Sequence, residues 1–154
     1  MAKFLTLNTH SWMEEEQETK LNQLAERILQ EKYDVICLQE VNQLMESEQV
    51  VQAPFYQAAE GAIAIHQDHF ALCLVKKLAE AGLDYHWSWA YNHIGFDIYN
   101  EGVTILSKNP LTPKEVLVSE VNDPRDYHTR KVLIAETEVE GQLMTIASCH
   151  LSWW

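Results

Sequence analysis

The order of apolar segments along the chain most restricts what it can fold into. Residues 4–7 and 34–39 are apolar runs typical of buried strands, and a segment with helical periodicity separates them. A second helix is predicted over about 69–80, and several strand patterns follow it. A doubly wound parallel sheet would keep alternating strands and helices, which this chain does not do. The order therefore favours an α+β fold with mixed or antiparallel sheets and helices packed outside them.

Local signals set the expected bounds of these elements. Ser11 and Glu14 have the spacing of a capping box, whereas Asp68 and Gly82 would cap and end the second helix. The expected inner face of the first helix consists of Leu21, Leu24, Ala25, Ile28 and Leu29. Later strands are predicted at 85–90, 103–107, 115–119, 131–139 and 143–150, with loops at 42–67, 91–101 and 122–129. Glu140-Gly141 predicts a hairpin between the last two strands.

Composition narrows the class of protein. We expect the 154 residues, 1–154, to form one domain or most of one, and 47% of them are hydrophobic, which is enough for a core. The net charge of -12 repels phosphate backbones and anionic membranes, so we expect no membrane partner and disfavour nucleic acid. No signal peptide or membrane-spanning run is evident. Three cysteines in apolar settings indicate buried thiols and a cytoplasmic location, and the oligomeric state stays open.

Two polar side chains end the first two predicted strands. Asn8 follows residues 4–7, and Glu40 follows residues 34–39. Neighbouring strands would bring the amide oxygen and the carboxylate together, and such hard ligands suit Mg²⁺. A solvated strand end for Glu40 and a turn for Asn8 are the competing interpretations. The pairing of the two residues favours a metal site.

Other polar residues also lie where chemistry could occur. Arg130 precedes a buried strand and could bind a phosphate with two hydrogen bonds, although for this residue taken alone a salt bridge to an acid is favoured. His150 ends an apolar run and could donate a hydrogen bond to a phosphoryl oxygen. His66 and His69 have a spacing that could hold zinc, but a solvated helix end is favoured. The aromatic residues that could either stack on a sugar or form core are Tyr85, Trp87, Trp89 and Tyr91.

Together these segments resemble the endonuclease/exonuclease/phosphatase family, whose fold is DNase I-like. The matching segments are 7–10 (LNTH), 36–41 (ICLQEV), 100–108 (NEGVTILSK) and 148–151 (SCHL), in the family's order. The resemblance implies a two-layer β-sandwich flanked by helices. It also implies Asn8 and Glu40 as ligands of Mg²⁺, with Mn²⁺ as a substitute, and Arg130 and His150 as catalytic residues near the scissile phosphate. Family members hydrolyse phosphoesters by in-line attack of an activated water.

The family pattern includes an Asp-x-Asn pair and a later Asp-His pair, and neither follows His150 here. On the resemblance, the chain corresponds to the N-terminal half to two-thirds of a catalytic domain, with a fold incomplete at the C-terminus. We therefore expect exposed sheet edges, exposed apolar surface and no turnover by the isolated chain.

The substrate is predicted from charge and from one segment. The acidic surface argues against a polynucleotide, and residues 92–97 resemble a bacterial branch that includes maltose 6'-phosphate phosphatases. The predicted function is a Mg²⁺-dependent phosphatase for a small sugar phosphate, with Tyr91, His93 and Arg130 binding the substrate. The alternatives are a nuclease or phosphodiesterase of the same family, or a truncated, non-catalytic binding module.

Overall fold

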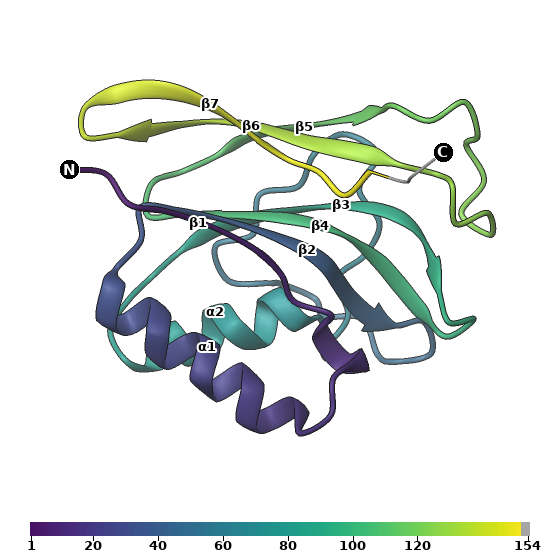
Figure 1. Ribbon diagram of the computed structural model, residues 1–154, viewed down its shortest axis with the longest axis horizontal. Coiled ribbons are helices and arrows are strands. Elements are labelled where there is room, and N and C mark those ends of the chain that lie inside the picture. Colours follow the sequence, from purple (N-terminus) through teal and green to yellow (C-terminus); the bar gives the residue numbers. More distant parts are fainter. Residues whose placement is uncertain (152–154) are drawn as a thin grey trace.

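Two β-sheets lie face to face in the computed structural model, which describes residues 1–151 (Figure 1). The elements are β1 (Phe4–Asn8), the 3-10 helix η1 (Ser11–Met13), α1 (Gln17–Glu31), β2 (Val35–Leu44), α2 (Phe70–Glu80), β3 (His86–Gly95), β4 (Tyr99–Ser107), β5 (Thr112–Leu117), β6 (Lys131–Val139) and β7 (Gln142–Ser148). Helices α1 and α2 cover the outer face of the larger sheet, and the smaller sheet packs on its inner face. The predicted α+β class and two-layer β-sandwich are confirmed.

The larger sheet has the strand order β1-β2-β4-β3, and the smaller one has the order β5-β6-β7. Strands β1 and β2 are parallel, with Asn8 opposite Gln39, whereas the other pairs are antiparallel. Helix α1 connects the parallel pair, so the carboxyl ends of β1 and β2 meet at the same end of the sheet. This topology places Glu40 beside Asn8, as the sequence predicted.

Helix α1 packs its predicted apolar face on the sheet. Leu21, Ala25 and Ile28 are buried, and Leu24 and Leu29 pack partly buried against the same core. The apolar spacing therefore orients this helix as expected. None of the helices in residues 1–151 is both long and apolar enough to cross a bilayer.

The two predicted helix caps are wrong, whereas the predicted start of α2 near residue 69 and its predicted stop are confirmed. Ser11 lies in η1 and its hydroxyl contacts that of Thr9 at 2.7 Å, while α1 begins only at Gln17. Asp68 accepts a hydrogen bond from the Leu44 backbone amide at 2.8 Å instead of capping α2. A local contact takes the Ser11 side chain and a tertiary contact takes that of Asp68, so neither caps its helix. Gly82 ends α2 with a positive φ of 83°, as predicted.

Several strands extend beyond their predicted bounds. Strand β2 continues to Leu44, and the predicted loop 91–101 is mostly the end of β3 and the start of β4. Cross-strand pairing outweighs the local polarity of these residues, because strand formation depends more on pairing and packing than on the sequence of the segment itself. Strand β5 lies a few residues earlier than predicted. The β6–β7 hairpin is confirmed, with positive φ at both Glu140 and Gly141.

The aromatic run of β3 forms core. Tyr85, Trp87 and Trp89 are each at most 1% exposed. Their polar atoms bind backbone carbonyls: the Tyr85 hydroxyl donates to Tyr33, and the two indoles donate to Pro54 and Val41. A buried tyrosine or tryptophan needs such a partner. These three residues therefore stabilise the fold and are not available to stack on a sugar.

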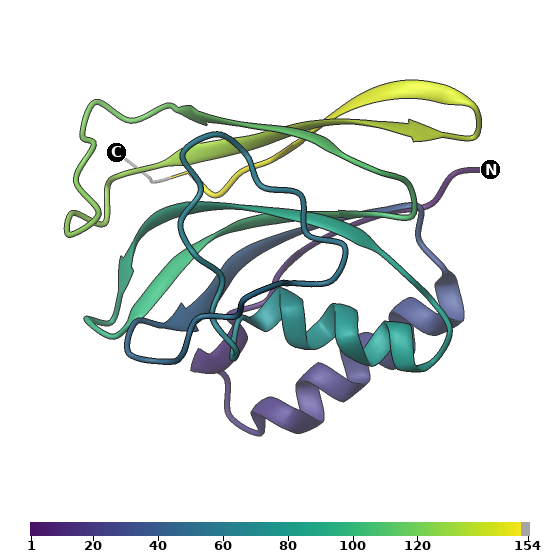
Figure 2. The same ribbon diagram turned by 180° about the vertical axis from the view of Figure 1, so that it is seen from behind.

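The two edges of the larger sheet differ. The segment between β2 and α2 runs along β3, where it exchanges backbone hydrogen bonds with Trp87 (Figure 2). Strand β1 has no such cover within residues 1–151, and Phe4 and Leu7 are 48% and 39% exposed. The prediction that residues 4–7 are buried is thus wrong, because β1 is an edge strand. The expected exposed edge and apolar surface are present.

The three thiols are less buried than predicted. Cys37 and Cys73 are half-buried, Cys149 is exposed, and all are free. Burial raises the pKa of Cys37 to about 11, so this thiol is protonated at neutral pH. The apolar neighbours of Cys149 in sequence do not bury it, since it follows the last residue of β7.

His69 lies in the core between two indole rings. Its ring centroid is 5.0 Å from that of Trp87 and 4.6 Å from that of Trp89, and both of its nitrogens lack a hydrogen-bond partner. Burial, with a smaller contribution from His66, lowers the pKa of His69 to about 3. Its ring is therefore neutral in the folded state, and the zinc alternative for His66 and His69 finds no support in this packing.

We predict that His69 makes the fold sensitive to acid. The unfolded chain takes up a proton at His69 near pH 6.5, whereas the folded chain does so only near pH 3, so stability falls as the pH drops through this window. The loss in unfolding free energy between pH 7.5 and pH 5 should be about 2 kcal/mol larger in the wild type than in His69→Phe. Urea unfolding at the two pH values measures this, and His86→Phe is the control. Equal losses in wild type and His69→Phe would contradict the prediction.

Candidate functional site

A cavity of about 230 Å³ opens at the end of the sandwich where β2, β3 and β4 meet the loop before β6. Its lining residues are Glu40, His93, Glu101, Tyr127, His128, Arg130, His150 and Leu151. Four residues singled out from the sequence, Glu40, His93, Arg130 and His150, therefore share one cavity although they come from distant segments. Asn8 lies beside this cavity through its contact with Glu40.

Asn8 and Glu40 form a direct contact. The Asn8 side-chain amide donates to Glu40 Oε1 at 2.7 Å, and its Oδ1 accepts the His10 backbone N–H at 3.1 Å. The parallel pairing of β1 and β2 creates this contact, since Asn8 is opposite Gln39. An amide and a carboxylate are thus held together at the edge of the cavity.

Glu40 does not end its strand, as the sequence suggested, but sits in a bulge within β2. Residues 39 and 40 together oppose the single residue Val103 of β4. Glu40 has a φ of 54°, in the left-handed region where a non-glycine residue costs about 1–2 kcal/mol. The bulge turns the Glu40 side chain to the cavity, and backbone strain at such a position is typical of functional sites.

Strand β4 has a glycine at the level of this bulge. Gly102 pairs with Val41 on one side and with Tyr91 on the other, and both partner strands have a register shift at this level. A Cβ at position 102 would lie 2.0 Å from the Ala90 carbonyl oxygen. Only glycine fits there, so β4 supports an irregularity in each of its neighbours.

The second irregularity orients Asn92. This residue is the extra one in β3, and its buried side-chain oxygen accepts the Lys131 backbone N–H at 2.8 Å. The bond links the larger sheet to the start of β6 in the smaller sheet. It thereby fixes the backbone next to Arg130.

Arg130 has a histidine partner and no acid partner. Its Nη1 donates to His93 Nδ1 at 2.9 Å, and its buried Nε has no partner among residues 1–151. No ion pair joins it to a carboxylate of the described chain, which argues against the salt-bridge interpretation. Burial lowers the pKa of Arg130, and the more distant Glu101 and Glu40 oppose that shift. A half-buried guanidinium with a free donor is suited to an incoming anion.

His93 links Arg130 to Glu101. Because His93 Nδ1 accepts from Arg130, the ring is neutral and Nε2 carries its proton, 3.5 Å from Glu101 Oε1. Burial, Arg130 and His150 lower the pKa of His93 to about 4. Burial and the nearby Glu40 raise the pKa of Glu101. The chain of contacts holds the guanidinium in place without cancelling its charge.

His150 faces Glu40 from the smaller sheet. Its Nε2 lies 3.7 Å from Glu40 Oε1, two residues after the end of β7. Burial lowers the pKa of His150, Glu40 opposes this, and Arg130 adds to it. The cavity thus brings together a carboxylate from β2, a histidine just after β7 and an arginine just before β6.

The cavity rim contains residues that sequence reasoning missed. Tyr127 and His128 stack with ring centroids 3.9 Å apart, and the loop that carries them is closed by hydrogen bonds between Asp123 and Thr129. No motif marks this pair in the sequence. Glu101 was also given no role there, although an acid inside a buried strand is an available signal.

Tyr91, by contrast, is not among the lining residues of this cavity. It is half-buried, its ring lies 5.9 Å from that of Trp89, and burial raises its pKa. Its predicted contact with a substrate remains untested.

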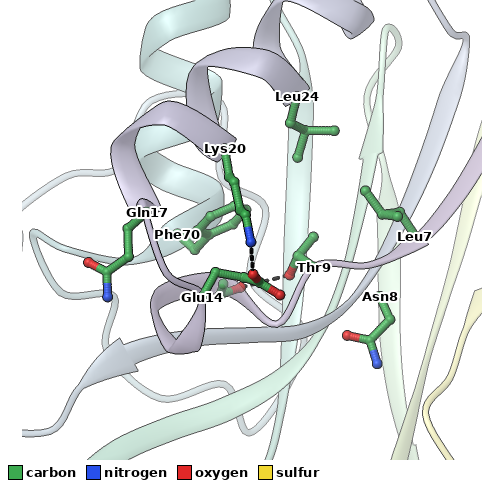
Figure 3. Close-up of a pocket in the computed structure, with 9 residues that line it drawn as sticks. Leu7, Asn8, Thr9, Glu14, Gln17, Lys20, Leu24 and Phe70 are labelled. Atoms are coloured by element: carbon green, nitrogen blue, oxygen red, sulfur yellow. Dashed lines mark hydrogen bonds and ion pairs between the residues drawn. The ribbon is translucent and has the colours of Figure 1, made fainter.

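A second cavity, of about 220 Å³, lies next to Asn8 between the end of β1 and α1 (Figure 3). Its charged groups are already paired, since Lys20 binds Glu14, and the hydroxyls of Thr9 and Ser11 bind one another. Few polar groups therefore remain free for a ligand. We place the candidate site in the first cavity, where a cation is free.

Within residues 1–151 no three His, Cys, Asp or Glu side chains lie close enough together to hold a metal. A closed cage of protein ligands, as in a structural zinc site, is thus not formed by this part of the chain. Magnesium requires less, because it keeps several waters and is often held by one or two protein oxygens. The Asn8–Glu40 pair fits that smaller requirement.

Comparison with known proteins agrees with the geometry. Residues 12–152 match the model of the Endonuclease/Exonuclease/phosphatase family, and the chain belongs to that family. It is similar to the solved structure of an endonuclease/exonuclease/phosphatase family protein from Leptotrichia buccalis C-1013-b, with 32% identity and a TM-score of 0.86 over 99% of this chain and 54% of that one. A search of curated proteins finds no match.

A more distant similarity concerns the fold alone. An endonuclease/exonuclease/phosphatase from Beutenbergia cavernae DSM 12333 matches with 19% identity and a TM-score of 0.61, over 97% of this chain. The chain spans 54% of the Leptotrichia protein and 37% of the Beutenbergia protein. The neighbours therefore contain much structure that this chain does not match.

We predict that strain at Glu40 can be measured by substitution. Glycine relieves a left-handed backbone and alanine does not, so Glu40→Gly should be about 1 kcal/mol more stable than Glu40→Ala. At Glu138, an exposed position of regular strand β6, the order should be reversed, because glycine weakens a strand. Thermal unfolding of the four variants measures both differences. If Glu40→Ala is at least as stable as Glu40→Gly, the backbone at position 40 is not strained.

Proposed function

We propose that this chain supplies the metal-binding and phosphate-binding groups of a Mg²⁺-dependent phosphoester hydrolase, a phosphatase for a small substrate such as a sugar phosphate. The observation that carries the proposal is Arg130, whose half-buried guanidinium has a neutral histidine partner and no carboxylate partner among residues 1–151, in the same cavity as Glu40 and His150. In a chain with a net charge of -12, a partly buried cation without an acid partner favours an anionic ligand.

Asn8 and Glu40 would hold the Mg²⁺, or Mn²⁺ in its place. Their oxygen atoms are hard ligands, and the Asn8 amide would rotate to present its oxygen instead of its N–H. The ion would supply charge neutralisation at the phosphoryl oxygens when bound. Its two positive charges would also offset Glu40 and Glu101, two acids that otherwise disfavour an anion in this cavity.

The side chains of the cavity would bind and orient the phosphoryl group. Arg130 would donate from the guanidinium edge that His93 leaves unbound, while His93 keeps the guanidinium in the plane set by its Nδ1 bond. His150 would donate from Nε2 to a phosphoryl oxygen in place of its present approach to Glu40. Such fixed donors act on charge that develops during the reaction, which is the larger part of phosphoryl-transfer catalysis.

A small substrate fits the charge of the molecule better than a polynucleotide. Binding an extended phosphate backbone requires several cationic contacts, whereas Arg130 is the single arginine or lysine that lines the cavity and its partner His93 is neutral. Tyr127 at the rim is 61% exposed and presents an aromatic surface on which a sugar ring could lie. These features support a sugar phosphate over a nucleic acid.

We predict that Mg²⁺ raises the melting temperature of the chain and that inorganic phosphate raises it further. A ligand that binds only the folded state at about 100 times its Kd adds about 2.7 kcal/mol. Glu40→Gln should lose the Mg²⁺ effect, and Arg130→Gln should lose the phosphate effect while keeping the Mg²⁺ effect. Differential scanning fluorimetry at fixed ionic strength measures both.

Matched controls remove the same charges elsewhere. Glu46→Gln removes one negative charge, as Glu40→Gln does, and Arg125→Gln removes one positive charge, as Arg130→Gln does. Neither residue lines the cavity, and Arg125 is exposed and paired with Asp123. Both should behave as the wild type. Loss of the Mg²⁺ effect in Glu46→Gln as much as in Glu40→Gln would mean that the ion binds the acidic surface in general, and the proposed metal site would be rejected.

We further predict that glucose 6-phosphate competes with phosphate at Arg130 in the presence of Mg²⁺, while glucose and a short single-stranded oligonucleotide do not. Glucose lacks the phosphoryl group that Arg130 would bind, and an oligonucleotide is an extended polyanion that the acidic surface would repel. Isothermal titration calorimetry on wild type and Arg130→Gln measures the competition. Tighter, Arg130-dependent binding of the oligonucleotide would favour the nuclease alternative and reject the sugar-phosphate assignment.

A further inference from the structure

The bulge that carries Glu40 is held by a side chain from a strand that is not adjacent to β2. The indole N–H of Trp89, in β3, donates to the backbone oxygen of Val41 at 3.2 Å. Strand β4 lies between them, so the bond crosses the width of a strand. Val41 follows the bulge residues directly, at the point where the regular pairing of β2 with β4 is interrupted.

Gly102 makes this bond geometrically feasible. It is the β4 residue that pairs with Val41, and a Cβ there would lie 2.8 Å from Trp89 Nε1. The indole nitrogen therefore lies against the position that a side chain at residue 102 would occupy. A larger residue at this position would push the indole away from the Val41 carbonyl.

The Trp89 ring is itself fixed on both sides. The His69 ring packs edge-on against it, with an interplanar angle of 86°, and the Tyr91 ring lies 5.9 Å away. Trp89 is 1% exposed, so water does not compete for its N–H. A donor held this firmly favours one conformation of the backbone it binds.

We propose that Trp89 is a positioning residue of the site: its indole N–H holds the β2 bulge in the form that directs the Glu40 carboxylate toward Asn8 and His150. Loss of the N–H would leave the Val41 carbonyl without this partner, and the bulge could relax toward regular pairing. The consequence for Mg²⁺ rests on the function proposed above, whereas the consequence for the backbone does not.

Trp87 provides a matched control within the same strand. It is equally buried, it also packs on His69, and its indole N–H also donates to a backbone carbonyl. That carbonyl belongs to Pro54, in the segment outside β3 and away from the bulge. A change from tryptophan to phenylalanine thus costs a similar hydrogen bond and a similar volume at the two positions.

The test compares Trp89→Phe with Trp87→Phe in the whole chain. Amide hydrogen exchange should accelerate about tenfold at Glu40, Val41 and Asn42 in Trp89→Phe and not in Trp87→Phe. The Mg²⁺ affinity measured by calorimetry should fall about tenfold in Trp89→Phe alone, because Glu40 would lose its fixed orientation; lost support of a metal ligand typically costs about 10- to 100-fold in affinity. Similar losses of melting temperature are expected in both.

Equal exchange at residues 40–42 in the two variants would overturn the proposal, whatever happens to Mg²⁺. If the wild type binds no Mg²⁺, the proposed function fails, and the exchange data still decide the role of Trp89. If Trp89→Phe does not fold, benzothienylalanine at position 89 replaces the N–H by sulfur and keeps the shape. Unchanged exchange with that residue would contradict the proposal, and faster exchange at 40–42 would support it.

Discussion

The absence of a side chain at Gly102 is the constraint on which the site depends. A central strand normally forces regular pairing on both neighbours, but β4 allows a bulge in β2 and an extra residue in β3 at the same level. One irregularity carries Glu40 and the other carries Asn92, which holds the backbone next to Arg130. The proposed metal ligand and the proposed phosphate-binding residue are therefore placed by the same point in the sheet.

The charges of the cavity follow from what surrounds each group. Glu40 and Glu101 make the local potential more negative, yet the single guanidinium that lines the same cavity is bound to a neutral imidazole and not to either acid. A direct Arg–Glu pair would consume the cation and leave nothing for an anionic ligand. The burial that lowers the pKa of His93 keeps it neutral, and this neutrality leaves the charge of Arg130 available.

The contact between Asn8 and Glu40 depends on the order of the strands and could be predicted from the sequence. The bulge at Glu40 depends on the register of the strands and could not. Asn8 and Glu40 could be brought together from two apolar runs, because a helix between them implies parallel neighbours. The bulge could not be foreseen, since glutamate is a poor indicator of a left-handed backbone. The polarity of segment 91–101 predicts a loop, yet Asn92 and Glu101 are buried in strands, where Asn92 binds the Lys131 backbone and Glu101 lines the cavity.

The most direct test of this account is an NMR titration of the chain with Mn²⁺, which broadens the signals of nuclei close to it. We expect the first equivalent to broaden the amides of Asn8, Glu40 and His150, with the regular part of β6 unaffected, and excess Mg²⁺ to reverse the effect. Broadening that begins at the acidic start of α1, or that spreads evenly over the surface, would contradict the placement of the metal at the Asn8–Glu40 pair.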